Sequence, residues 1–62
     1  MTHLPQDPYM LLSVVNQKLR DQYPSLEALC DDLAVHQRTL EAVLDTIGYA
    51  YDPRRNAFLP GS

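Results

Sequence analysis

The fold is decided by the stretch from Ser25 to Gly48, which reads SLEALCDDLAVHQRTLEAVLDTIG. Serine is a preferred helix N-cap, and glycine suits the left-handed position that ends many helices. Between these two residues, apolar side chains recur at three- and four-residue spacing in two runs that a short turn separates. The stretch therefore predicts two helices, over residues 26–33 and 37–47, joined as a helix-turn-helix whose corner is filled by Val35.

An earlier helix is predicted over residues 8–23. The pair Asp7-Pro8 signals its start, because an aspartate carboxylate accepts a bond from a free helix amide and proline at the first helical position wastes no donor. At helical spacing, its inward face is expected to hold Leu12, Val15, Leu19 and Tyr23, with Leu11 at the edge. The inward faces of the two later helices are expected to hold Leu26, Leu29, Cys30 and Leu33, and then Leu40, Val43, Leu44 and Ile47.

A β-hairpin is predicted over residues 49–59. Two short strand-like runs flank residues 52–55, whose Asp-Pro opening suits a turn. Tyr49 and Tyr51 alternate with an alanine, so both rings are expected on one face over the core, with their hydroxyls reaching water. The predicted fold class is mainly α: residues 1–62 form a single three-helix helix-turn-helix domain with a small C-terminal β-hairpin, which is winged-helix-like.

Length and charge limit the classes of function. With 62 residues and a mass of 7.1 kDa, the chain forms one small domain, which excludes a dinucleotide-binding unit, a barrel or a two-domain enzyme. Its formal charge of −3 has the wrong sign for a protein that binds nucleic acid mainly through phosphates. A chain this small sits near the lower limit of independent stability, so a partner would add burial that its own core lacks.

Neither a membrane span nor secretion is indicated. No stretch approaches about 18 consecutive apolar residues, and the N-terminus lacks a basic region followed by a long apolar run. The single cysteine, Cys30, cannot form an internal disulfide, which favours a reducing compartment. We therefore expect a cytoplasmic protein that does not associate with a membrane.

No enzyme or cofactor site is expected. Cys30 and His36 offer a nucleophile and a base, but Cys30 falls on the inward face of its helix, where burial raises a thiol pKa and suppresses the thiolate. These two residues and His3 lack any recognised metal-ligand spacing. Asp31 and Asp32 are adjacent, so their side chains diverge by about 100° around a helix. The expectation is no catalytic residue, no metal ion and no cofactor.

The chain carries the motifs of a known family. They are P-x-D-P-x-M-L-L-S from Pro5, N-x-K-L-R-D from Asn16 and G-Y-x-Y from Gly48, followed by Asn56 and Phe58. In these motifs the chain resembles, along nearly its whole length, a family of small bacterial proteins classed as a domain of unknown function. The resemblance implies a freestanding, helical bacterial protein and leaves its function open.

Met10 and Val14 form the candidate interface. At about 100° per residue, both point away from the apolar stripe of the first helix, so they either stay exposed or pack on a partner. A homodimer or another protein partner on this side would add burial; the alternative is scattered surface apolar residues without a role. Beside the stripe, Asn16 is polar where leucine would pack better, and its amide is expected to bond a loop backbone or to fix a dimer register.

A DNA-binding function is the alternative reading. In a DNA-binding helix-turn-helix the third helix enters the major groove, where Gln37, Arg38 and Thr39 would meet base edges. Arg54 and Arg55, at the tip of the hairpin, would then lie by phosphates or in the minor groove. Because three arginines neutralise at most about three phosphates, a monomer of this kind would bind weakly.

Carboxylates on the third helix oppose that reading. Glu41 and Asp45 fall on the same exposed face as Arg38. The simpler expectation is that Arg38 pairs loosely with Glu41 on an ordinary solvated helix face. The sequence therefore favours a non-enzymatic protein-interaction or adaptor module, and the alternative is a small DNA-binding regulator that reads the major groove with its third helix.

Overall fold

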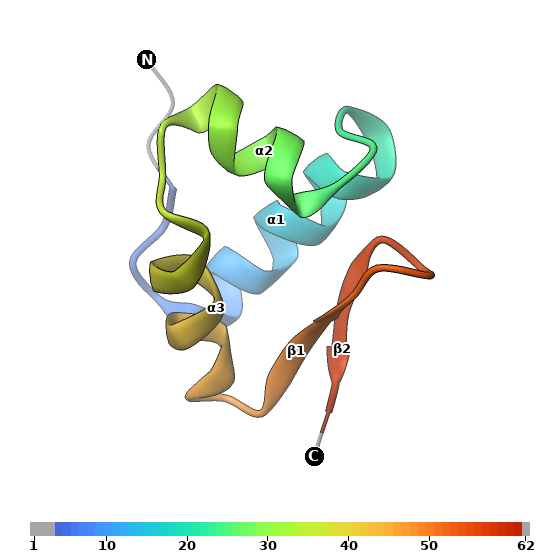
Figure 1. The fold of residues 1–62 in the computed structure, drawn as a ribbon. Coiled ribbons are helices and arrows are strands. Elements are labelled where there is room, and N and C mark those ends of the chain that lie inside the picture. Colours follow the sequence, from blue (N-terminus) through green and yellow to red (C-terminus); the bar gives the residue numbers. More distant parts are fainter. Residues whose placement is uncertain (1–3, 62) are drawn as a thin grey trace.

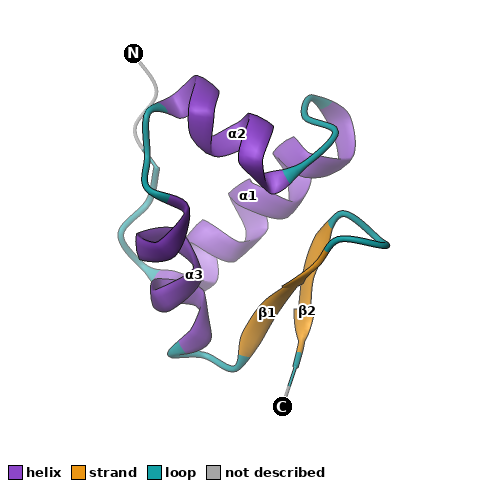
Figure 2. Ribbon diagram, viewed as in Figure 1, coloured by secondary structure: helices purple, strands orange, loops and turns teal. Residues whose placement is uncertain are grey.

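Three helices followed by a two-stranded antiparallel hairpin make up the fold (Figure 1). The computed structural model describes residues 4–61. The elements are α1 (Pro8–Asp21), α2 (Leu26–Leu33), α3 (Gln37–Asp45), β1 (Tyr49–Asp52) and β2 (Ala57–Pro60), which confirms the predicted order. In Figure 2 the hairpin lies beside the helices, with β1 packed against α3 and β2 against α1. Within the described residues, no helix is long and apolar enough to cross a membrane.

The predicted helix starts are confirmed. The Asp7 carboxylate accepts a hydrogen bond from the Met10 N–H at 3.0 Å, and Pro8 occupies the first helical position of α1. At α2, the Ser25 hydroxyl accepts a hydrogen bond from the Ala28 N–H at 3.1 Å. Each cap satisfies a helix amide that has no partner within its own helix.

The C-terminal end of α1 differs from the prediction. The predicted helix runs to Tyr23, whereas the observed helix stops at Asp21. The N–H groups of Gln22 and Tyr23 both donate to the carbonyl of Lys18, at 2.7 and 3.0 Å, so the last turn widens. The proline that follows disfavours helical dihedral angles at Tyr23, which explains why the helix does not continue.

The end of α3 also comes earlier than predicted, at Asp45 rather than Ile47. The N–H groups of Thr46, Ile47 and Gly48 donate to carbonyls three residues back, at 3.0 to 3.2 Å, which is the tighter 3-10 pattern. Gly48 then takes a φ of +79°, as predicted for the residue that ends this segment.

One apolar cluster joins the three helices to the hairpin. Its buried members are Leu11, Val15, Leu19, Leu26, Leu29, Cys30, Leu40, Leu44 and Phe58. The predicted stripe of α1 is wrong at one position, because Leu11 is buried and Leu12 is only half-buried. Leu11 faces the side that α3 covers, whereas Leu12 lines an open groove toward the hairpin. The other residues predicted to face inward pack half-buried against the cluster: Tyr23, Leu33, Val43, Ile47 and, at the corner, Val35.

The hairpin places two tyrosines over the core. Tyr49 and Tyr51 both pack against the apolar cluster, as predicted, and the Tyr51 ring lies 5.6 Å from the ring of its cross-strand partner Phe58. The prediction that both hydroxyls reach water is wrong for Tyr51. Its hydroxyl donates to the Asn56 side-chain oxygen at 2.6 Å and accepts from the Leu26 N–H at 3.2 Å. A free amide at the start of α2 thereby gains an acceptor.

The turn of the hairpin is anchored to α1 by Asn56. The Asp52 carboxylate accepts from the Arg54 N–H at 2.9 Å, in agreement with the predicted Asp-Pro turn. Asn56 has a φ of +53°, a left-handed conformation that asparagine tolerates better than most residues. Its Nδ2 donates to the carbonyls of Leu19 and Tyr23, both at 3.0 Å. The Asn56 side chain thus supplies a donor to two carbonyls that have no helix partner where α1 ends.

Candidate interaction surface

The outer side of α1 carries exposed apolar side chains. Tyr9 and Met10 are 66% and 61% exposed, and they are the large hydrophobic residues that stand exposed within residues 4–61. Val14, one turn after Met10, is half-buried. Ser13 and Gln17 are exposed and lie between these side chains around the helix. We call these five residues the α1 face.

A small rotation of α1 explains why the sequence pattern selects Met10 and Val14 and passes over Tyr9. Because the buried stripe contains Leu11 in place of Leu12, its centre is displaced by about 40° around the helix axis. The displacement turns Val14 toward the core and Tyr9 toward solvent. A helical wheel centred on the correct stripe would have identified Tyr9.

Charge changes sign along α1. Asp7 caps the first turn, and Lys18 and Arg20 lie in the last turn. Arg20 also pairs with Asp21, with 3.2 Å between Nε and Oδ1, on side chains that are 76% and 50% exposed. An exposed pair of this kind contributes little to stability. The start of α1 is therefore acidic, and its end carries an excess of positive charge.

A groove of about 970 Å³ runs between α1 and the hairpin, beside the α1 face. Tyr9 lines it from α1, and Tyr49 and Arg55 line it from the hairpin. Its lining also includes Asn16, whose side chain bonds the main chain of Phe58. This confirms the predicted backbone bond of Asn16, with a strand in place of a loop. Tyrosine and arginine at the rim of a groove are typical of surfaces that contact another protein.

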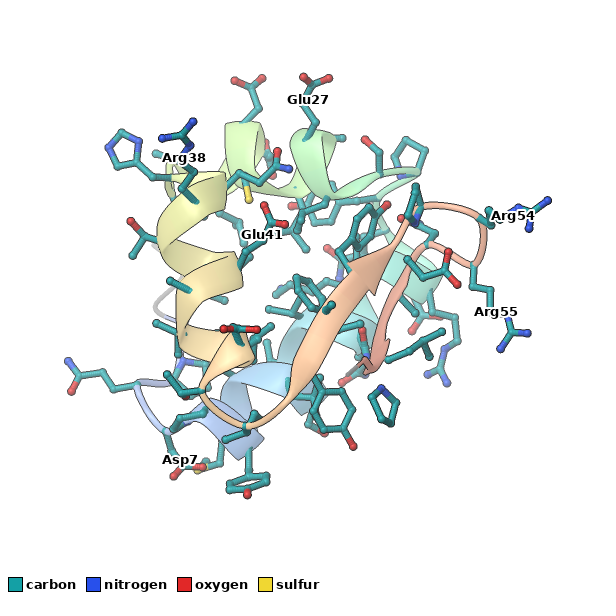
Figure 3. All side chains as sticks on the ribbon, turned by 60° about the horizontal axis from the view of Figure 1, so that its bottom comes forward. Asp7, Glu27, Arg38, Glu41, Arg54 and Arg55 are labelled. Atoms are coloured by element: carbon teal, nitrogen blue, oxygen red, sulfur yellow. The ribbon has the colours of Figure 1, made fainter. Side chains whose placement is uncertain are left out.

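The candidate DNA-contacting residues lie in two separate groups. Gln37, Arg38 and Thr39 are exposed on the first turn of α3, and Arg54 and Arg55 are exposed at the tip of the hairpin. Figure 3 shows Arg38 and the two tip arginines at opposite ends of this face of the molecule. The fold therefore does not gather these five side chains into one positive patch.

Glu41 takes its hydrogen bond from Gln37 and not from Arg38. Its Oε2 accepts from the Gln37 Nε2 at 3.3 Å, and in Figure 3 Arg38 points away from it. The predicted pair of Arg38 and Glu41 is therefore wrong; within residues 4–61, the ion pair found joins Arg20 and Asp21. Gln37 precedes Glu41 by four residues, a spacing at which side chains meet on a helix.

Cys30 is 5% exposed and belongs to the core, as its helix position predicts. Burial, with a smaller contribution from the charge of Glu41, raises the pKa of its thiol, so the nucleophilic thiolate is suppressed at neutral pH. Asp31 and Asp32 are exposed, and Asp32 accepts a hydrogen bond from the Tyr23 hydroxyl. In the part of the chain that the structure describes, no three His, Cys, Asp or Glu side chains are grouped to hold a metal ion.

A known protein family matches most of the chain. Residues 5–58 match the family described as "Domain of unknown function (DUF4250)". The chain belongs to the DUF4250 family. The three sequence motifs that begin at Pro5, Asn16 and Gly48 fall inside the match, which confirms the resemblance found in the sequence. Comparison with curated proteins and with solved structures gave no match. Since DUF4250 brings no activity or site residue to carry over, the function is argued from the α1 face.

Proposed function

We propose that this DUF4250 protein is a non-enzymatic protein-interaction module of winged helix-turn-helix type, which pairs with a second copy of itself through the α1 face. The observation that carries the proposal is the exposure of Tyr9 and Met10, at 66% and 61%, on adjacent positions at the start of α1. Single exposed apolar side chains are ordinary, but two large ones on the same helix turn, with Val14 one turn further on, favour a contact site. The hairpin that follows α3 and packs against it supports the winged type.

Charge favours an antiparallel pair of α1 helices. In that arrangement Asp7 of one copy meets Lys18 and Arg20 of the other, so the acidic start of each helix lies by the basic end of its partner. Opposite ends of the two helix dipoles also come together. Ser13, near the middle of the α1 face, is small enough to let the two helices approach closely.

The size of the domain supports dimerisation. A chain of 62 residues buries only about 60% of its unfolded surface, so it gains more from an added apolar contact than a larger domain does. Removal of Tyr9 and Met10 from water stabilises the pair by about 25 cal/mol for each Å² of apolar surface buried. The proposal includes a reducing, cytoplasmic setting, which the single buried thiol of Cys30 supports.

Sedimentation equilibrium tests the dimer. We expect the wild-type protein to be dimeric, and Met10→Glu and Val14→Glu to be monomeric, because an unpaired carboxylate in an apolar interface is costly. Thr39→Glu introduces the same charge at an exposed position on α3 and should remain dimeric. Helical circular dichroism should be equal in the wild type, Met10→Glu and Thr39→Glu, whose substituted positions are exposed, and Val14→Glu counts as a test only if its spectrum matches them. A wild type that is monomeric at high micromolar concentration contradicts the proposal.

Two further variants, Arg38→Ala and Arg54→Ala, test the alternative of a DNA-binding regulator. Fluorescence anisotropy is measured with a random-sequence DNA duplex at low and at moderate salt. The proposed interaction module is expected to show no salt-sensitive binding at micromolar concentration. Salt-sensitive binding that is lost in both Arg38→Ala and Arg54→Ala would contradict the interaction module. It would indicate a DNA-binding regulator that contacts phosphates through these residues.

A further inference from the structure

The outer edge of β2 is blocked. The Phe58 N–H donates to the Asn16 Oδ1 at 2.7 Å, and the Phe58 carbonyl accepts from the Asn16 Nδ2 at 3.0 Å. Two positions further on, Pro60 has no N–H to offer. A side chain and a proline therefore close this edge against pairing with another strand.

The outer edge of β1 is open. Tyr51 faces Phe58 in the register, and since the main-chain groups of Phe58 bond Asn16, this pair is a non-hydrogen-bonded one. The Gly61 N–H donates to the Gly48 carbonyl at 3.0 Å, so Gly48 and Gly61 form a hydrogen-bonded pair. Because hydrogen-bonded and non-hydrogen-bonded pairs alternate along an antiparallel hairpin, the next pair, Tyr49 with Pro60, is non-hydrogen-bonded. The main-chain groups of Tyr49 and Tyr51 therefore point away from β2. Within residues 4–61, no backbone or side-chain group bonds them.

An acidic groove runs along this open edge. Its volume is about 420 Å³, and Glu41, Ala42 and Asp45 line it from α3 while Tyr49 and Ala50 line it from β1. In Figure 3, Glu41 points from α3 toward the hairpin, whereas Arg38, which lines one end of the groove, points away from it. The unbonded main-chain groups of Tyr49 thus lie on the β1 side of the groove, and the carboxylates of Glu41 and Asp45 lie on the α3 side.

We propose that this groove binds an extended, basic segment of a partner protein, which adds to β1 as a third strand. The main chain of the segment would bond the N–H and C=O groups of Tyr49 and Tyr51. Every second side chain of a strand points the same way, at a spacing of about 6.7 Å. Glu41 and Asp45 are four residues apart on α3, a rise of about 6 Å. Lysine or arginine at alternate positions of the segment therefore matches the two carboxylates.

A second copy of this chain suits the groove less well. Its own β1 would bring a second Glu41 and Asp45 to the same contact, and both chains carry a net charge of −3. Like charges placed against each other in an interface oppose association. The partner is therefore a different, basic chain, and its site is separate from the α1 face.

Binding of a model peptide tests the proposal. The probe is an eight-residue peptide of alternating valine and lysine, labelled for fluorescence anisotropy and titrated with the full chain at low salt. A peptide of alternating valine and glutamate is expected not to bind. Two further peptides carry N-methyl groups on all valine amides or on all lysine amides. Because alternate residues of a strand direct their N–H groups to opposite edges, one methylated peptide should lose binding and the other should keep it.

Variants of the protein locate the site. The double variant Glu41→Gln/Asp45→Asn should weaken binding by at least about tenfold. Its matched control, Glu27→Gln/Asp31→Asn, removes the same charge from exposed positions of α2 and should change binding by less than about twofold. Ala42→Phe fills the groove from an exposed position and should abolish binding while circular dichroism remains that of the wild type. Met10→Glu should bind as the wild type does, which separates this site from the proposed dimer.

Three results would overturn the proposal. If both methylated peptides bind like the parent, the contact is electrostatic and no strand is added. If the control double variant loses as much affinity as the groove variant, the peptide responds to net charge alone. If Ala42→Phe turns a wild-type dimer into a monomer in sedimentation equilibrium and the peptide fails to bind, the groove is occupied by a second copy.

Discussion

Asn56 makes three side-chain hydrogen bonds from a left-handed position in the hairpin turn, to Leu19, Tyr23 and Tyr51. Asn56→Gly keeps the backbone conformation accessible and removes the bonds, so it should lower the free energy of unfolding by about 2 to 3 kcal/mol. Asn56→Ala also loses the left-handed preference and should cost about 1 kcal/mol more. Urea denaturation followed by circular dichroism measures both. Equal stability of the glycine variant and the wild type would show that these bonds do not hold the turn.

A second left-handed residue, Ala34, marks a limit of sequence reasoning at this scale. It has a φ of +57° at the end of α2, where its N–H donates to Asp31 and the Val35 N–H donates to the Cys30 carbonyl at 3.0 Å. These bonds form the helix ending that glycine usually occupies. Gly48 was predictable as such an ending because of its residue type. Alanine gives no such signal, and the next residue, Val35, packs half-buried against the apolar cluster.

Among the elements, α1 shows how far periodicity predicts a helix. Its start follows from Asp7 and Pro8 alone, since capping is local. The rotation of α1 about its own axis does not follow from the sequence, because Leu11 and Leu12 are equally apolar. Only the positions of α3 and the hairpin decide which of the two is buried. The difference of one residue also determines the exposure of Tyr9, and with it the composition of the α1 face.

The contact between the end of α1 and α2 should make stability depend on pH. The hydrogen bond to Asp32, then burial, then the charge of Asp32 raise the pKa of Tyr23. The pKa of Tyr23 in the folded protein lies above its unfolded value of about 10. The stabilisation from the hydrogen bond is therefore complete below about pH 10 and disappears as the pH rises through the folded pKa. The stability difference between wild type and Tyr23→Phe, from urea denaturation, should be constant between about pH 7 and 9 and shrink above about pH 10. A difference that stays constant through this alkaline range would show that the bond is absent in solution.

For the whole molecule, the order of elements follows from the sequence, and the placement of distant groups does not. Asn16 and Phe58 are 42 positions apart, and nothing in either local pattern shows that the amide of one closes the strand edge of the other. Similarly, the spacing of Arg38 and Arg54 along the chain does not reveal that they lie at opposite ends of one face. The open edge of β1 could be recognised only after Asn16 had fixed which cross-strand pairs are hydrogen-bonded.

The rate at which the Cys30 thiol is labelled measures how readily the whole molecule opens. Cys30 is 5% exposed within the apolar cluster of residues 4–61, so a bulky reagent reaches its sulfur far more easily when α2 separates from α1 and α3. Burial also raises its pKa, which slows reaction of any partly open form. Labelling by a disulfide reagent at neutral pH should be at least about 100-fold slower in buffer than in urea, in line with the stability of a small domain. If two copies associate as proposed, the rate in buffer should fall further as protein concentration rises, because association favours the folded state by mass action. Rapid labelling with unchanged circular dichroism would instead show that α2 opens locally, without unfolding of the rest.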